Sequence, residues 1–230
     1  MSTQSRIVSV RMVGYSLTAA LLLAAASVDV AADCAEWGWK PGTGVPGVDS
    51  GCVWDIASWD PDGPAGPDPE LLVVGGEFKV AGGGIASYLA AWDGAEWHPV
   101  GGGTNGRVFA LTVYDGELIV GGEFTSVGGV SCDYIAAWDG QQWKPLASGM
   151  NGWVWTLDVY AGELVAGGDF TTAGGVPCQR IARWDGEQWQ PLGTGTNERV
   201  KALTVYQDTL VAGGLFSARL KRLSLSVVMD

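Results

Sequence analysis

The residues of this chain with the clearest capacity for chemistry are carboxylates that recur at a fixed spacing. Glu77, Glu123 and Asp169 each follow a pair of glycines and lie 46 residues apart. Carboxylate oxygens at equivalent positions of a repeated fold could surround a cation. The series ends at Leu215, which carries no carboxylate. We therefore favour the simpler interpretation that each carboxylate accepts hydrogen bonds from backbone N–H groups of a neighbouring loop.

Residues for catalysis or for metal binding of the usual kinds are few. His98 is the single histidine, and Lys144 and Gln190 take its place in the following repeats, so the repeat does not specify a base there. A serine nucleophile normally needs such a base. The four cysteines include no Cys-x-x-Cys pair, so a zinc site of the usual spacing is not expected. We predict no catalytic residues, no metal site and no cofactor.

The elements that position these side chains repeat every 46 residues without a slip in register. The period relates pairs of glycines, two tryptophans and an Asp-Gly turn. The recurring residues are Gly75-Gly76, Gly121-Gly122, Gly167-Gly168 and Gly213-Gly214; Trp92, Trp138 and Trp184; Trp97, Trp143 and Trp189; and Asp93, Asp139 and Asp185. A period in the forties is typical of a β-propeller blade, which needs four short strands and their turns.

One repeat shows the four expected strands clearly. Alternating, β-branched and aromatic residues predict strands, and Asp-Gly and double-glycine signals mark turns and close approaches. The expected strands are Val154 to Tyr160, Leu164 to Phe170, Ile181 to Trp184 and Trp189 to Leu192, with a loop over Thr171 to Pro177. In such a blade the short turns lie on one face and the longer connections on the other. The fold class is therefore all-β, a propeller of four-stranded antiparallel blades.

The strand count bears on whether the ring of blades is closed. We divide the chain into a signal peptide (1–32), repeats (33–216) and an atypical tail (217–230), and the blade units are about 53–100, 107–147, 153–193 and a partial 199–216. A lone strand at Trp39 to Pro41 brings the count to fifteen, whereas a four-bladed ring needs sixteen. Leu223 to Val228 alternates and could supply the missing strand. The count favours about four blades in an open or truncated ring.

The first residues have the pattern of a secretory signal. Arg6 and Arg11 precede an apolar stretch from Met12 to Val28, and small residues before Asp33 suit cleavage after Ala32. An uncleaved anchor is the alternative. We expect a secreted, periplasmic or cell-surface protein with no membrane span after cleavage.

An oxidising compartment permits disulfides. Cys34 and Cys52 flank a Gly/Pro-rich loop and are the preferred bridge. Cys132 and Cys178 occupy equivalent positions of consecutive repeats, which in such folds are often too far apart to bond, so we interpret them as buried thiols.

The charge balance excludes one class of partner. The 230 residues carry a formal net charge of −12, with 13 Lys and Arg against 25 Asp and Glu. Such a surface offers no basic face for a phosphate backbone, so nucleic-acid binding is not expected. The partner that remains is a protein or a carbohydrate.

The repeated pattern hhhGG(E/D)F followed by IAxWDGxxWxPL, where h is hydrophobic, resembles kelch-type β-propeller repeats. It is similar to the repeats of secreted bacterial propellers of unknown function and to those of the fungal cortical polarity-marker family. The resemblance covers about Trp37 to Phe216. It implies the propeller fold and leaves the ligand open, because propellers include enzymes, adhesins and scaffolds.

The long-loop face varies between repeats, so we expect any ligand to bind there. Trp153 replaces Arg107 and Arg199 at one varying position, beside Asn151. An exposed tryptophan next to an amide suits a carbohydrate ring or a protein contact, although packing against Trp155 explains it equally well. The predicted ligand-binding residues are Arg107, Asn151, Trp153, Tyr134, Arg180 and Arg199.

Three functions remain compatible with the sequence. The first is a secreted or cell-surface interaction module for protein or glycan, without catalysis. The second is a polysaccharide-active propeller hydrolase or lyase with paired carboxylates. The third is a non-functional fragment of a larger repeat protein.

Overall fold

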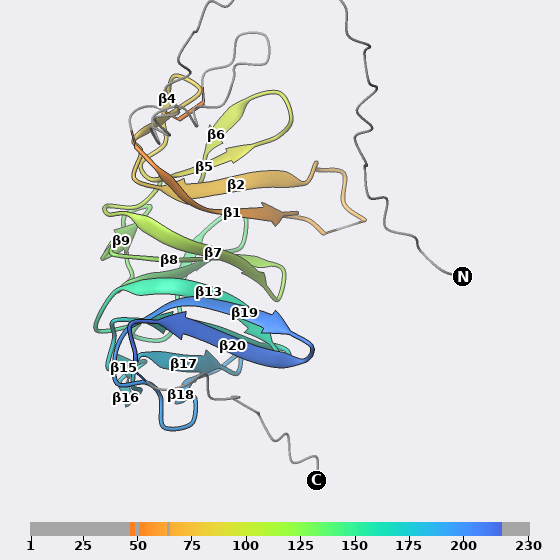
Figure 1. Ribbon diagram of the computed structural model, residues 1–230. Coiled ribbons are helices and arrows are strands. Elements are labelled where there is room, and N and C mark those ends of the chain that lie inside the picture. Colours follow the sequence, from red (N-terminus) through yellow and green to blue (C-terminus); the bar gives the residue numbers. More distant parts are fainter. Residues whose placement is uncertain (1–46, 49–50, 64, 218–230) are drawn as a thin grey trace, which may run out of the picture. The chain divides into compact units, whose positions relative to one another are not determined.

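The computed structural model describes residues 47–48, 51–63 and 65–217, which form strands and turns and no helix that could cross a membrane (Figure 1). The predicted signal peptide, Cys34, the strand at Trp39 to Pro41 and the strand at Leu223 to Val228 lie outside these ranges.

Three four-stranded antiparallel sheets and one two-stranded sheet form the blades, each with its strands in sequence order. The first blade contains β1 (Val53–Trp59), β2 (Leu71–Gly76), β5 (Leu89–Trp92) and β6 (Trp97–Pro99). The second contains β7 (Val108–Tyr114), β8 (Glu117–Gly122), β11 (Ile135–Trp138) and β12 (Trp143–Pro145). The third contains β13 (Val154–Tyr160), β14 (Glu163–Gly168), β17 (Ile181–Trp184) and β18 (Trp189–Pro191). The last contains β19 (Val200–Tyr206) and β20 (Thr209–Gly214). The all-β prediction and its strand order are confirmed, and the proline of each four-stranded blade lies on an edge strand as expected.

The segment predicted as a plain loop over Thr171 to Pro177 contains a short hairpin instead. Its strands are β15 (Thr172–Ala173) and β16 (Val176–Pro177), and the first two blades have equivalents in β3 (Val80–Ala81) with β4 (Gly84–Ile85) and β9 (Ser126–Val127) with β10 (Val130–Ser131). The turn residues Gly174 and Gly175 both have positive φ, at 57° and 81°. That conformation is the one a two-residue hairpin turn requires.

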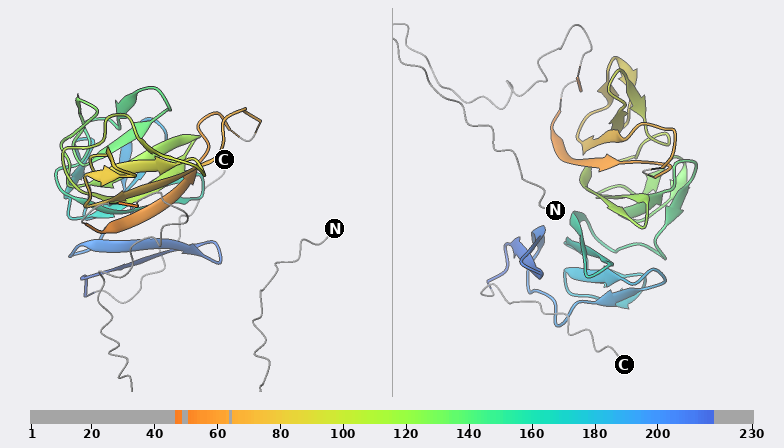
Figure 2. Two further views of the ribbon diagram at one scale, coloured as in Figure 1. Left: turned by 90° about the horizontal axis from the view of Figure 1, so that it is seen from above. Right: turned by 90° about the vertical axis from the view of Figure 1, so that its right-hand side faces the viewer.

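Successive blades pack through their first strands, so β1, β7, β13 and β19 lie side by side in that order. Figure 2 (right) shows the four sheets following one another around an arc. At each junction, which we call a blade joint, a glycine of one blade receives a valine of the next. A Cβ on Gly121 would lie 2.6 Å from Val154 Cγ1, and Gly75 and Gly167 are equally close to their valines. The double glycines therefore mark close approaches, as the sequence indicated.

Hydrogen bonds complete the blade joints. The Asp55 carboxylate accepts a bond from Leu111 N at 2.8 Å, and the Thr156 hydroxyl oxygen accepts one from Leu203 N at 3.1 Å. Burial raises the pKa of Asp55, although the hydrogen bonds that its carboxylate accepts from the backbone N–H groups of Leu111 and Ile56 act in the opposite direction. At the other end of β1, Trp59 Nε1 donates a hydrogen bond to the carbonyl oxygen of Gly116 in the next blade.

The core lies between neighbouring blades. Each full blade buries a phenylalanine after its double glycine, and the side chains are Phe78, Phe124 and Phe170. Cys132 and Cys178 are buried free thiols, as predicted, and burial raises their pKa values. Cys52 is exposed and forms no disulfide with any described residue, so its pairing with Cys34 remains a prediction.

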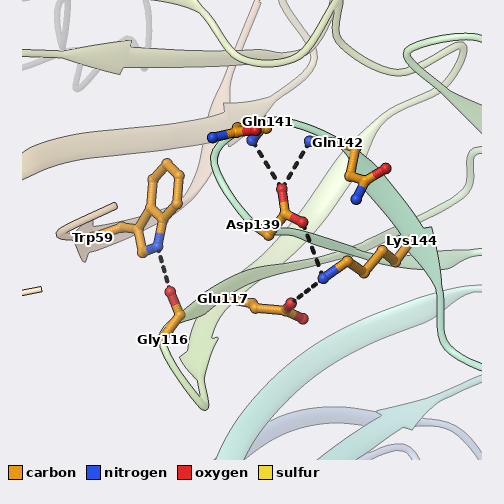
Figure 3. A network of polar contacts seen from close by, with 7 residues as sticks. All are labelled: Trp59, Gly116, Glu117, Asp139, Gln141, Gln142 and Lys144. Atoms are coloured by element: carbon orange, nitrogen blue, oxygen red, sulfur yellow. Dashed lines mark hydrogen bonds and ion pairs between the residues drawn. The ribbon is translucent and has the colours of Figure 1, made fainter. Parts of the chain in front are cut away.

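The short-turn face is held by a repeated carboxylate network. Asp139 accepts hydrogen bonds from the backbone N–H groups of Gln141 and Gln142 at 2.9 and 2.8 Å and pairs with Lys144, which also reaches Glu117 (Figure 3). His98 occupies the register of Lys144 and lies 2.7 Å from Asp93 in the same way. These side chains stabilise turns, as expected of the Asp-Gly pairs.

The two ends of the arc remain uncovered by described residues. Strand β1 exposes about half of Trp54 and Ile56, and β19 exposes 65% of Tyr206. Equivalent residues inside the arc are more buried, because a neighbouring blade covers them. The structure is consistent with an open or truncated propeller.

Candidate ligand-binding site

An aromatic cluster lies on the long-loop face, where the first strands of successive blades begin. It consists of Trp54, Phe109 and Trp155, each the second residue of a first strand, together with Trp153. Phe109 and Trp155 stack with ring centroids 4.3 Å apart and an interplanar angle of 7°. Trp54 meets Phe109 edge-on at 5.4 Å, and Trp153 meets Trp155 in the same way at 5.7 Å. Three blades therefore contribute to one continuous aromatic surface.

The cluster is open to solvent at both ends. Trp54 is 49% exposed and Trp153 is 39% exposed, whereas Phe109 between them is buried. At the far side Lys201 Nζ lies 5.4 Å from the centroid of Trp155, within the range of a cation–π contact. The two packed rings hold the exposed tryptophans in place, so the surface requires little ordering when a ligand binds.

Ion pairs border the aromatic cluster. Arg107 lies 2.6 Å from Glu77 of the preceding blade and 3.4 Å from Glu123 of its own blade. The hydrogen bond to Glu77 is the main cause of the raised pKa of Arg107. Arg199 pairs with Asp169 at 3.1 Å, and the second oxygen of Asp169 accepts a bond from Trp155 Nε1.

The carboxylates after the double glycines therefore have partners other than those expected. They pair with arginine and tryptophan side chains, whereas the sequence favoured backbone N–H donors. The sequence shows the arginines at this register, but their pairing with carboxylates of the preceding blade follows only from the packing of the blades side by side. Among the residues that the structure describes, no three His, Cys, Asp or Glu side chains gather as a metal would require.

Asn151 lies beside the cluster but is engaged by its own loop. Its Oδ1 accepts bonds from the N–H groups of Thr171 and Thr172 at 2.7 and 2.9 Å, and its Nδ2 donates to the Thr171 hydroxyl. Asn105 holds the equivalent loop of the second blade in the same way. Asn151 and Asn105 thus order the loops of the long-loop face.

Tyr134 and Arg180 occupy one register, and both have a φ of 67°. Tyr134 packs against the core, and the Arg180 guanidinium donates to the carbonyl of Asp169. Of the six predicted residues, the structure thus brings Arg107, Trp153 and Arg199 to the aromatic cluster and its border. The other three shape the loops around it.

Sequence reasoning did not assign Trp54 and Phe109 to this site. Each first strand has a register shift at its second residue, for example between Val108 and Ala110. A bulge leaves one residue unpaired and re-aims its side chain. Strand periodicity alone does not locate such a bulge, so the sequence did not single out these aromatic residues.

Comparisons with known proteins agree with this architecture. A family model described as a domain of unknown function (DUF5122) beta-propeller matches residues 115–136 and 162–184. The two segments lie at nearly the same register in consecutive blades and extend from the first turn to the third strand. The comparison with curated proteins found no match. The repeated four-stranded antiparallel sheets and this match together show that the chain is a β-propeller repeat protein.

Proposed function

We propose that this protein is a non-catalytic binding module that holds a carbohydrate against the aromatic cluster. The observation that carries the proposal is the pair of half-exposed indoles, Trp54 and Trp153, fixed by the stack of the buried Phe109 on the partly buried Trp155. A rigid aromatic surface offers a large apolar contact area at low entropic cost. The flat apolar side of a pyranose ring matches that surface in shape and polarity.

The bordering ion pairs supply the polar contacts that such a ligand needs. Arg107 and Arg199 offer N–H donors, and the carboxylates of Glu77 and Asp169 offer acceptors, all fixed by their mutual pairing. Sugar hydroxyls can donate to the carboxylates and accept from the guanidinium groups. A few oriented polar groups around an apolar centre are typical of ligand sites.

The same pairing argues against the hydrolase or lyase alternative. A glycosidase needs one carboxyl group that stays protonated and a second that is ionised. Glu77 and Asp169 are each engaged in an ion pair with an arginine, and they lie at different blade joints. Two carboxyl groups placed in this way do not flank one glycosidic bond, so the proposal is binding without cleavage.

The N-terminal pattern supports placing this activity outside the cytoplasm. A secreted or cell-surface module would encounter polysaccharides there. Mass spectrometry of the protein exported by a secreting host is expected to show an N-terminus at Asp33.

Trp153→Arg provides a sharp test of the binding site. Arginine occupies this register in two other blades, at Arg107 and Arg199, so the substitution suits the scaffold while removing the indole. Binding of the purified protein to a panel of soluble neutral and acidic oligosaccharides would be measured by isothermal titration calorimetry. For any oligosaccharide that binds, the variant should lose about tenfold in affinity. Ile85→Ala, which removes an exposed apolar side chain from β4, is the matched control and should bind normally.

Two results would contradict the proposal. If no oligosaccharide in the panel binds, the carbohydrate assignment is wrong. If one binds but Trp153→Arg and Trp54→Ala leave its affinity unchanged while both variants remain folded, the ligand lies elsewhere on the protein.

A further inference from the structure

The two ends of the arc carry the two halves of a blade joint. At every internal joint the first-strand valine of the following blade enters the space beside a glycine of the preceding blade. The pairs are Gly75 with Val108, Gly121 with Val154, and Gly167 with Val200. The three valines are completely buried. The joint is therefore a repeated interface of fixed geometry.

At the last described blade the glycine remains, but no residue of the described ranges takes the place of its valine. A Cβ built on Gly213 would meet only Ala202 Cβ, at 3.9 Å, whereas the equivalent Cβ on Gly167 would lie 2.7 Å from Val200. The surrounding side chains Ala202, Thr204 and Tyr206 are exposed. We call the surface of Ala202, Thr204, Tyr206 and Gly213 the tail face.

The first blade has the opposite half. Val53 occupies the register of the joint valines, since it pairs with Gly76 as Val108 pairs with Gly122. Ile56 occupies the register of Leu111 and Leu157, which are buried against the preceding blade, yet Ile56 is 51% exposed. We call the surface of Val53, Ile56 and Ser58 the head face.

The two positions that carry the ion pair at internal joints also correspond at the open ends, because both are uncharged there. Two of the three internal joints pair a carboxylate with an arginine, as Glu77 does with Arg107 and Asp169 with Arg199. At the open ends Leu215 takes the register of the carboxylate and Cys52 takes that of the arginine, and both are exposed. Because the carboxylate and the arginine are both replaced by uncharged residues, joining the ends would bury no unpaired charge at these positions.

From these observations we infer that the tail face binds the head face of a second copy of this chain. The contact would repeat the blade joint, with Val53 of one copy beside Gly213 of the other. It is a head-to-tail contact, which closes into a ring when the rotation permits and otherwise continues to further copies. This assembly extends the interface already built three times within the chain and goes beyond the carbohydrate proposal, although a repeated joint would also place the second copy beside Trp54.

Two substitutions block one face each and leave the internal joints untouched. Gly213→Val fills the vacant space of the tail face, and its Cβ meets ordinary contacts within the chain. Ile56→Lys places a charge on the head face at a residue that is already half exposed. Circular dichroism and thermal melting would verify that both variants fold, and Thr204→Lys is a second tail-face variant.

Sedimentation velocity over a range of concentrations would measure the assembly. The unmodified protein should associate. The assembly of either single variant should already dissociate at a protein concentration at least tenfold higher than the one at which the unmodified assembly dissociates. An equimolar mixture of Gly213→Val and Ile56→Lys should recover a species of two chains, because one intact head face and one intact tail face remain. An isologous contact or non-specific aggregation would not give this complementation.

Several outcomes would overturn the inference. One is an unmodified protein that stays monomeric at all concentrations, as it would if residues outside the described ranges covered the two faces. Another is an assembly that persists in both single variants. A mixture in which the folded variants both remain monomeric would also exclude the head-to-tail contact.

Discussion

At the scale of single residues, glycine placement decides which side chains the blade joints tolerate. Gly121→Ala would place a Cβ 2.6 Å from Val154 Cγ1, between two sheets that pack closely. We expect it to lower the free energy of unfolding by about 1–3 kcal/mol, the usual effect of overpacking a core. Urea denaturation measures this change.

Gly213→Ala is the matched control, because it changes the same register where the neighbouring valine is missing. Its Cβ would contact only Ala202 at 3.9 Å. We expect stability within about 0.5 kcal/mol of the unmodified protein, or slightly higher. Equal losses for the two substitutions would show that the glycines serve local strand geometry and not the approach of the next blade.

The turn aspartates give the fold an acid-sensitive component. Hydrogen bonds from Glu96 N, His98 and Ala95 N, in that order, lower the pKa of Asp93 from 3.8 to about 2. A carboxyl group whose pKa is lower in the folded state stabilises the fold above its unfolded pKa and loses that effect as the pH falls. The contribution of Asp93 should thus be complete above about pH 4 and largely lost by pH 2.

Asp93→Asn tests this window, because the amide oxygen can still accept the backbone bonds but does not titrate. The difference in melting temperature between the unmodified protein and the variant should shrink as the pH falls from 5 to 2. A difference that is constant over this range would mean that the Asp93 charge does not contribute to folding.

At the scale of elements, the sequence predicts the long strands well, but it predicts neither the short hairpins nor the residues in β-bulges. The bounds expected for the first strands, such as Val154 to Tyr160, match the structure because β-branched alternation and Asp-Gly turns act locally. The hairpin of β15 and β16 was missed because its strands are two residues each, too short to show a period. The bulges at Phe109 and Trp155 depend on pairing with the second strand, so the aromatic cluster was not predictable from one strand alone.

The loop that carries β15 and β16 depends on a single amide side chain. Asn151→Ala removes the acceptor for Thr171 N and Thr172 N and the donor to the Thr171 hydroxyl. We expect a loss of about 1 kcal/mol in unfolding free energy and faster hydrogen exchange at these two amides. Asn151→Asp keeps the acceptor and should retain most of the protection. If both variants exchange at the unmodified rate, the amide does not order the hairpin.

At the scale of the whole molecule, stability should decline toward the open end. Strands β7 and β19 have nearly the same sequence, VFALTVY and VKALTVY, but β7 lies between two blades and β19 is covered on one side. Their intrinsic exchange rates are therefore closely matched. At low protein concentration the amides of β19 should exchange at least tenfold faster than those of β7.

Hydrogen exchange followed by mass spectrometry would resolve the two strands. Equal protection at low concentration would mean that another part of the chain covers the tail face. Protection of β19 that rises with concentration, while β7 stays unchanged, would accompany the head-to-tail assembly.

The uniform blade joint also has a consequence for how such a gene can change. Because every joint places the same valine beside the same glycine, an in-frame duplication or deletion of 46 codons with its breakpoints between Leu71 and Gly214 recreates a joint of the existing kind. Recombination between repeats can therefore lengthen or shorten the protein by whole blades without inventing a new interface. An insertion of an odd number of residues inside a strand would instead move the side chains that follow it to the opposite face of the sheet.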